Sequence, residues 1–181
     1  MIKNRTKVSK FMSLLLRHRP QNFGLTVDKY GFADFNKVFD ILMKKFPGLE
    51  KKDVYKLIEN APNQRFQIKE GKIRARYGHS IEIKPGGRSH TVPEVLYHGT
   101  SPKNWGSIQN KGLKPGKRKF VHLSISVKDA LRVGKRKDRH PLILKIDAQT
   151  AQKNGLPFWK EEKVYLTKEV PPPYISVYKD K

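Results

Sequence analysis

Three consecutive basic residues, Arg17, His18 and Arg19, stand directly before Pro20. Apolar residues precede them at helical spacing, and a proline disfavours helical geometry at the residue before it, so we predict a helix that ends at Arg19. Cations at a helix C-terminus can simply complement the helix dipole. Alternatively, guanidinium groups bind phosphate oxygens in a fork and an adjacent imidazole donates as well, which would make the cluster an anion pocket.

The overall charge favours the second interpretation. The 181 residues include 39 Lys and Arg but only 16 Asp and Glu, which gives a net charge of +23. Residues 1–90 hold 20 basic and 8 acidic side chains, so the excess is spread over the body of the chain. A solvated lysine-rich surface is the plainer explanation, but so basic a body favours a polyanionic partner, above all nucleic acid.

Several other partners and sites are not expected from the composition. No segment has the length of a membrane span and the N-terminus lacks a signal-peptide core, so we expect no membrane partner. The absence of cysteine excludes disulfides and thiolate metal sites and is compatible with a cytoplasmic location. The histidines and acids show no metal-ligand spacing, so no metal is expected.

Two further helices are predicted in the first half of the chain. Asp34 is a favourable N-cap for a helix that ends at Pro47-Gly48, and another helix begins near Glu50. Before them, Asp28 and Gly31 bracket a turn between two short extended pieces.

A hairpin completes the first predicted domain. Residues 65–69 and 73–77 alternate between apolar and polar side chains, and Glu70-Gly71 lies at the turn between them. Three helices followed by a two-stranded ribbon is the order of a winged-helix domain, which we place at 1–84. Turn-forming residues without periodicity then predict a linker at 85–92.

Short strands and helices alternate in the second predicted domain, at 93–181. The first strand, at 95–100, is predicted to deliver a corner at His98-Gly99-Thr100, where the glycine would let the backbone approach a flat ligand. Helices follow N-caps at Ser101 and Ser126. Further strands are predicted at 121–125, 141–147, 164–167 and 174–178, with a short helix after Asp147.

Five groups of residues occur in order along the chain: Leu16-Arg17-His18-Arg19-Pro20, Gly24-Leu25 with Asp28-x-x-Gly31-Phe32, Ile73-Arg74-Ala75 with Gly78-His79-Ser80, Leu96-Tyr97-His98-Gly99-Thr100, and Val121-His122-Leu123-Ser124. Their joint order and spacing resemble the KptA/Tpt1 family of NAD-dependent RNA 2′-phosphotransferases. The resemblance implies an α+β protein in which a winged-helix lobe joins an ADP-ribosyltransferase-like lobe with a split β-sheet. RNA phosphate and NAD would meet between the two lobes.

The resemblance also implies a two-step reaction. An RNA 2′-phosphate, such as tRNA splicing leaves at a junction, attacks the anomeric carbon of the nicotinamide ribose and expels nicotinamide. The ribose 2″-hydroxyl then attacks the transferred phosphate, which releases 2′-OH RNA and ADP-ribose 1″,2″-cyclic phosphate. Because the phosphate is its own nucleophile, the protein has to supply placement and charge neutralisation.

Site residues follow from the matching positions. The catalytic tetrad would be Arg17, His18, Arg65 and Arg136, with Arg139 in reserve because the segment after Gly134 carries one extra residue and lacks a second glycine. NAD would be bound by His98, Gly99, Thr100, Leu123, Ser124, Arg132, Val133 and Gly134, although core packing is an open alternative for Leu123 and Val133. RNA would be contacted by Arg19, Arg74, His79 and Ser80.

Two other functions remain open from the sequence. A winged helix with this charge could be a non-catalytic RNA-binding protein, which would not need the His98-Gly99-Thr100 motif. An ADP-ribosyltransferase that stops after the first step would cap terminal phosphates of RNA or DNA with the same residues. For the 2′-phosphotransferase as for these alternatives, we expect a monomer.

Overall fold

The computed structural model describes residues 5–61, 64–86 and 91–179. It is an α+β protein, as the sequence predicts, and it divides into two compact units, Met1–Pro85 (unit 1) and Gly86–Lys181 (unit 2). Each unit is described by itself. Of the predicted linker, residues 87–90 lie outside the described residues.

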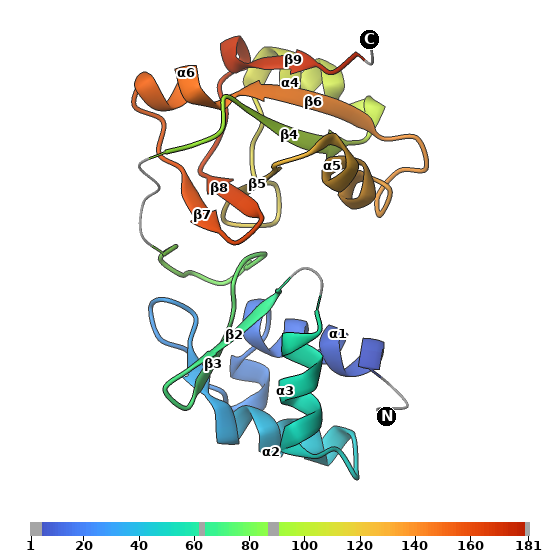
Figure 1. Ribbon diagram of the computed structural model, residues 1–181, viewed down its shortest axis with the longest axis vertical. Coiled ribbons are helices and arrows are strands. Elements are labelled where there is room, and N and C mark those ends of the chain that lie inside the picture. The colour runs from blue at the N-terminus through green and yellow to red at the C-terminus, as the bar shows by residue number, and fades with distance from the viewer. Residues whose placement is uncertain (1–4, 62–63, 87–90, 180–181) are drawn as a thin grey trace. The chain divides into compact units, whose positions relative to one another are not determined.

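Unit 1 combines three α-helices with a small antiparallel sheet of order β1-β3-β2 (Figure 1). Its elements are α1 (Arg5–Arg17), the 3-10 turn η1 (Gln21–Phe23), β1 (Ala33–Asp34), α2 (Phe35–Lys45), α3 (Lys51–Glu59), β2 (Phe66–Lys69) and β3 (Lys72–Ala75).

The helices of unit 1 form where the sequence provides caps and an apolar face. The face of α1 is fully buried at Met12, Leu15 and Leu16, and each such side chain stabilises the fold by about 1.5–3 kcal/mol. The Asp34 carboxylate accepts a hydrogen bond from the Lys37 backbone N–H at 2.9 Å, which confirms the predicted N-cap of α2. The end of α1 at Arg17 brings the basic cluster to the border of this core.

The predicted hairpin is also confirmed. β2 and β3 pair with Ile68 opposite Ile73, and the two turn residues have φ of 49° (Glu70) and 71° (Gly71). Two left-handed residues in a row form the turn that matches the twist of a two-residue hairpin. The alternation therefore buries Phe66 and leaves the charged side chains of both strands outside the core.

The turn at Asp28 is present, but the extended pieces around it are not both strands. The Asp28 carboxylate accepts hydrogen bonds from the N–H groups of Tyr30 and Phe32, each at 2.9 Å, and Gly31 has a φ of 81°. Residues 24–27 form no strand, because their backbone pairs with no neighbouring strand, and β1 comprises only two residues.

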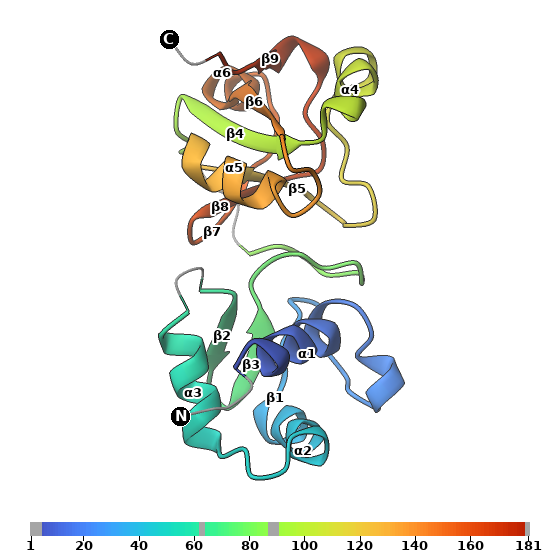
Figure 2. The same cartoon turned by 90° about the vertical axis from the view of Figure 1, so that its right-hand side faces the viewer.

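Unit 2 is built on a six-stranded antiparallel sheet of order β7-β8-β5-β4-β6-β9 (Figures 1 and 2). Its strands are β4 (Val95–Thr100), β5 (Val121–Ser124), β6 (Leu142–Asp147), β7 (Trp159–Glu161), β8 (Val164–Thr167) and β9 (Ile175–Val177). Its helical segments are η2 (Pro102–Asn104), α4 (Trp105–Lys111), α5 (Val127–Gly134), α6 (Ala148–Lys153) and η3 (Pro172–Tyr174).

The predicted strand at 95–100 is confirmed as β4, but the corner predicted within it at His98-Gly99-Thr100 is absent. All three residues lie in β4 and pair with β6, from His98 opposite Leu144 to Thr100 opposite Leu142. Gly99 is instead required by packing, since a Cβ there would collide with the carbonyl oxygen of Ala130 in α5. A Cβ on Gly134 would lie 2.7 Å from the Pro141 side chain and 3.2 Å from the Gly99 Cα. The two glycines thus let α5 lie directly on β4 (Figure 2).

The apolar core of unit 2 is shared by the sheet and the other helices. It includes Leu96 and Ile146 from the sheet, Ile108 from α4 and Ala151 from α6. In the described part of the chain, no helix combines the length and the apolar character that crossing a membrane requires.

Candidate functional site

Arg17, the last residue of α1, is held by aromatic rings and by a glycine. Its guanidinium carbon lies 5.7 Å from the Phe66 ring centroid and 5.5 Å from that of Tyr77. A Cβ on Gly78 would lie 3.3 Å from the Arg17 Nη1, and the φ of Gly78 is 92°, so both space and conformation favour glycine. Cation–π contacts of this kind contribute about 0.5–2 kcal/mol each and fix the plane of the guanidinium.

The segment after β3 is tied to the end of α1. The Ser80 N–H donates to the Arg17 carbonyl oxygen at 3.0 Å, and the Ser80 hydroxyl lies 3.0 Å from the His18 Nδ1. Both bonds join residues more than 60 positions apart in sequence. They fix the exposed His18 ring and the Arg17 backbone to the same residue, Ser80.

Two more predicted arginines lie on or near the hairpin. The Arg74 guanidinium donates from Nε to the Gln67 side-chain oxygen at 2.8 Å and stacks 5.0 Å from the Phe32 ring centroid. Arg65 is half-buried just before β2, where its carbonyl oxygen accepts from the Arg76 N–H at 2.9 Å. Arg19 is exposed beyond the end of α1.

His79 is buried close to the cationic side chains of Arg17, Arg74 and His18. Its side chain is 3 % exposed, and a Cβ on Gly31 would lie 3.2 Å from its Nε2. Burial first, and then the positive charges of Arg17, Arg74 and His18, lower the pKa of His79 to about 3. His79 is therefore a neutral, buried imidazole close to these cations. Its contact with RNA stays a prediction.

In unit 2, His98 has one ring nitrogen fixed by the backbone. Its Nδ1 lies 2.9 Å from the His122 carbonyl oxygen, which can only accept, so Nδ1 carries the hydrogen. Burial lowers the pKa of His98, and the charges of Lys137 and Arg118 lower it further, against the opposing effect of the His122 hydrogen bond. The imidazole is therefore neutral with an unprotonated Nε2, which suits it to accept a hydrogen bond from a hydroxyl group.

The other residues predicted to bind NAD differ in how exposed they are. Leu123 is 0 % exposed and belongs to the core, the alternative that the sequence left open. Thr100 is 6 % exposed, and its hydroxyl accepts from the Asn104 amide at 3.0 Å. Arg132 is exposed and pairs with Asp129 at 2.7 Å, while Ser124 is half-buried at the end of β5.

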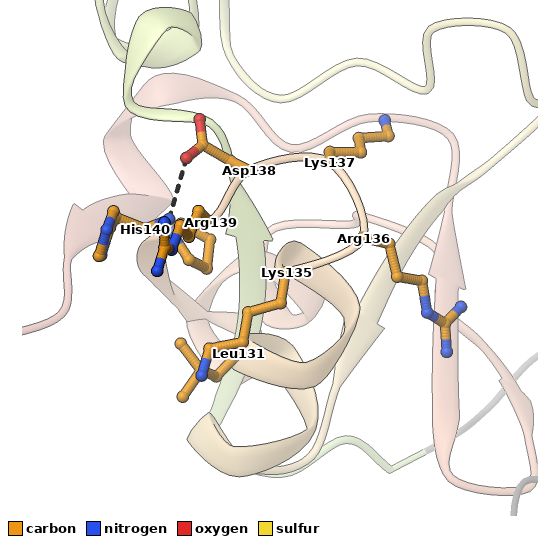
Figure 3. Close-up of a pocket in the computed structure, with 8 residues that line it drawn as sticks. Leu131, Lys135, Arg136, Lys137, Asp138, Arg139 and His140 are labelled. Atoms are coloured by element: carbon orange, nitrogen blue, oxygen red, sulfur yellow. Dashed lines mark hydrogen bonds between the residues drawn. The ribbon is translucent and has the colours of Figure 1, made fainter.

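Arg136 and Arg139, the alternatives for the fourth arginine, share the segment that follows α5. The segment lines an open pocket of about 760 Å³ with Leu131, Lys135, Arg136, Lys137, Asp138, Arg139, His140 and Pro141. In Figure 3 the Arg136 side chain points away from those of Arg139 and His140. Among the described residues, no group of three His, Cys, Asp or Glu side chains could hold a metal ion.

Comparison with known proteins places these features in a family. A family model described as RNA 2′-phosphotransferase, Tpt1/KptA family, matches residues 3–169. The chain belongs to the Tpt1/KptA family. A probable RNA 2′-phosphotransferase 2 of Archaeoglobus fulgidus is 41 % identical over 96 % of this chain and 81 % of its own length. A probable RNA 2′-phosphotransferase of Thermococcus kodakarensis is 39 % identical over 96 % of this chain and 97 % of its own length. One of Bacillus thuringiensis is 39 % identical over 97 % of this chain and 96 % of its own length.

Membership of the Tpt1/KptA family confirms the predicted family and makes the chain an enzyme of the transferase class. The roles of individual residues stay predictions. Sequence reasoning missed three supporting contacts: Tyr77 against Arg17, Asn104 bonded to Thr100, and Asp138 bonded to Ser101. The first and third join positions far apart in the sequence. Thr100 and Asn104 are four residues apart at the start of a predicted helix, so this contact alone offered a local signal.

Proposed function

We propose that this Tpt1/KptA protein removes an internal RNA 2′-phosphate by transferring it to NAD. The products are 2′-OH RNA, nicotinamide and ADP-ribose 1″,2″-cyclic phosphate. The observation that carries the proposal is the orientation of the Arg17 guanidinium by two aromatic rings and a glycine, one position before His18 in the sequence, in a member of an RNA 2′-phosphotransferase family. The removal of the phosphate follows the family, and the use of NAD follows the sequence resemblance.

The cationic group in unit 1 suits a phosphate ligand. The planar guanidinium of Arg17 offers parallel N–H donors to two phosphate oxygens, and Arg65 would add a second fork. His18, fixed by Ser80, would donate or accept at a third oxygen. Because the RNA phosphate is itself the nucleophile, these residues act by binding and orienting it and by neutralising the charge that grows on it.

His98 supports the assignment of NAD to unit 2. NAD supplies a ribose carbon from which nicotinamide can leave, and such a ribose carries hydroxyl groups that donate hydrogen bonds. The Nδ1–H of His98 donates to the His122 carbonyl oxygen, so the acceptor nitrogen Nε2 can accept a hydrogen bond from such a hydroxyl. Gly99 and Gly134 would act indirectly, by letting α5 lie close to the strand that carries His98.

The architecture is consistent with finer assignments of both units. Three helices and a small sheet that ends in the β2–β3 hairpin support a winged-helix interpretation of unit 1. Unit 2 has an antiparallel sheet whose strands β4 and β5, together with the helix α5, carry the predicted NAD residues, and this arrangement supports an ADP-ribosyltransferase-like lobe.

The proposal is tested with an RNA oligonucleotide that carries one internal 2′-phosphate. We expect 2′-OH RNA to form only when NAD is present. Arg17→Lys should lower kcat by about tenfold or more, because lysine keeps the charge but loses the fork. Lys10→Arg, an exchange at an exposed position of the same helix, is the matched control and should react at the wild-type rate.

Three results would contradict the proposal. Phosphate removal without NAD would exclude NAD as the acceptor. A stable ADP-ribosylated RNA as the end product would indicate the capping activity instead. Tight RNA binding without turnover would favour a binding protein.

A further inference from the structure

The segment between α5 and β6 is a closed loop rich in positive charge. Residues 135–140 contain four Lys or Arg side chains and one acid, Asp138. At the base, a Cβ on Gly134 would lie 2.7 Å from the Pro141 side chain, so the two ends of the loop touch. The N–H groups of Lys137 and Asp138 donate to the Gly134 carbonyl at 2.9 and 3.1 Å, which turns the chain directly after the helix.

The tip of this loop is fastened to the end of β4 by one carboxylate. Asp138 Oδ2 accepts from the Ser101 hydroxyl at 2.6 Å, and Asp138 Oδ1 accepts from the His140 N–H at 3.0 Å. Each oxygen thus has its own donor, one within the loop and one outside it. Ser101 directly follows Thr100, the last residue of β4, and is three positions after His98.

The hydrogen bonds that Asp138 accepts keep its carboxylate ionised. The Ser101 hydrogen bond, and then the one from the His140 N–H, lower the pKa of Asp138, with smaller contributions from the charges of Lys103 and His140. Asp138 is therefore ionised at neutral pH and accepts at both oxygens. Hydrogen bonds to a charged acceptor are shorter and stronger than neutral ones, in keeping with the 2.6 Å distance.

We propose that Ser101 and Asp138 form a latch that positions the arginine-bearing loop 135–140 relative to β4. The two residues are positioning residues, because they act through the loop and through Arg136. This inference rests on the proposed function, in which Arg136 takes part in the reaction. Without the latch, four like charges within one short loop repel one another and would move the arginine away from its place.

The latch predicts a pattern of kinetic effects. Ser101→Ala should lower kcat by about 10- to 100-fold, as misplacement of a reacting group by about 1 Å does, with little change in the KM for RNA. Ser101→Thr keeps the hydroxyl and should restore most of the rate. In an Arg136→Ala background, Ser101→Ala should have almost no further effect, whereas a general loss of stability would act in both backgrounds. Ser107→Ala, at an exposed serine of α4, is the matched control.

A second measurement does not depend on the reaction. Trypsin cleaves after Lys and Arg, so it should cut within residues 135–139 several-fold faster in folded Ser101→Ala and Asp138→Ala than in wild type or Ser107→Ala. If wild type fails to act on 2′-phosphorylated RNA but the cleavage rates follow this order, the proposed function fails and the latch stands. Equal cleavage rates, or a full Ser101→Ala effect in the Arg136→Ala background, would overturn the latch.

Discussion

Acidification should destabilise unit 1 through His79. An unfolded histidine has a pKa near 6.5, whereas the buried imidazole in the folded protein has a pKa of about 3. Below pH 6.5 the unfolded chain therefore binds a proton that the folded chain does not, so the free energy of unfolding falls until the pH approaches 3. Between about pH 7.5 and about pH 5 this one group should remove about 2 kcal/mol. Because both of these pH values lie well above the folded-state pKa of about 3, the size of the loss is set mainly by the unfolded-state pKa.

Native-state hydrogen exchange of the β2 and β3 amides measures this loss for unit 1 alone. The exchange rates are corrected for the intrinsic rate at each pH and converted to opening free energies. His79→Gln cannot be protonated in this range, so its opening free energy should fall by about 2 kcal/mol less than that of wild type. His140→Gln, at an exposed histidine of unit 2, is the control and should behave as wild type. An equal loss in wild type and His79→Gln would refute the reasoning.

Two more predictions concern packing and charge. Gly99→Ala should destabilise unit 2 by about 2 kcal/mol or more in thermal unfolding, because its Cβ meets the Ala130 carbonyl. Gly106→Ala, in open space on α4, should be neutral or stabilise the helix by up to about 1 kcal/mol, and similar effects of the two changes would contradict the packing assigned to Gly99. RNA affinity should fall steeply with salt. If four phosphates are neutralised, the loss is about 50-fold between about 50 and 200 mM, and a flat dependence would exclude binding through phosphate contacts.

Local sequence signals predicted most of the elements correctly. Asp34, Ser126 and Asp147 each accept a backbone N–H three residues ahead, so the caps could be read from neighbouring residues. The hairpin was equally accessible, because alternation and the Glu70-Gly71 turn are properties of one short segment. β7 was missed, since its three residues give too little alternation to detect.

The supporting contacts of the candidate site could not be predicted in the same way. Gly99 was assigned to ligand approach, but the atom that requires a glycine there belongs to Ala130, on a helix some 30 positions later. The Tyr77 ring beside Arg17 and the Ser101–Asp138 bond likewise join distant parts of the chain. Residue type and spacing identify the groups that could do chemistry, whereas tertiary packing determines which groups hold them.

The most direct test of NAD-dependent phosphate removal is a stoichiometric one. Wild-type protein is incubated with NAD and RNA carrying one internal 2′-phosphate, and nicotinamide, 2′-OH RNA and ADP-ribose cyclic phosphate are counted in the same reaction. We predict that the three products appear in equal amounts and that none forms when NAD or the 2′-phosphate is left out. Nicotinamide release without 2′-OH RNA, or 2′-OH RNA accompanied by free phosphate, would contradict the transfer to NAD.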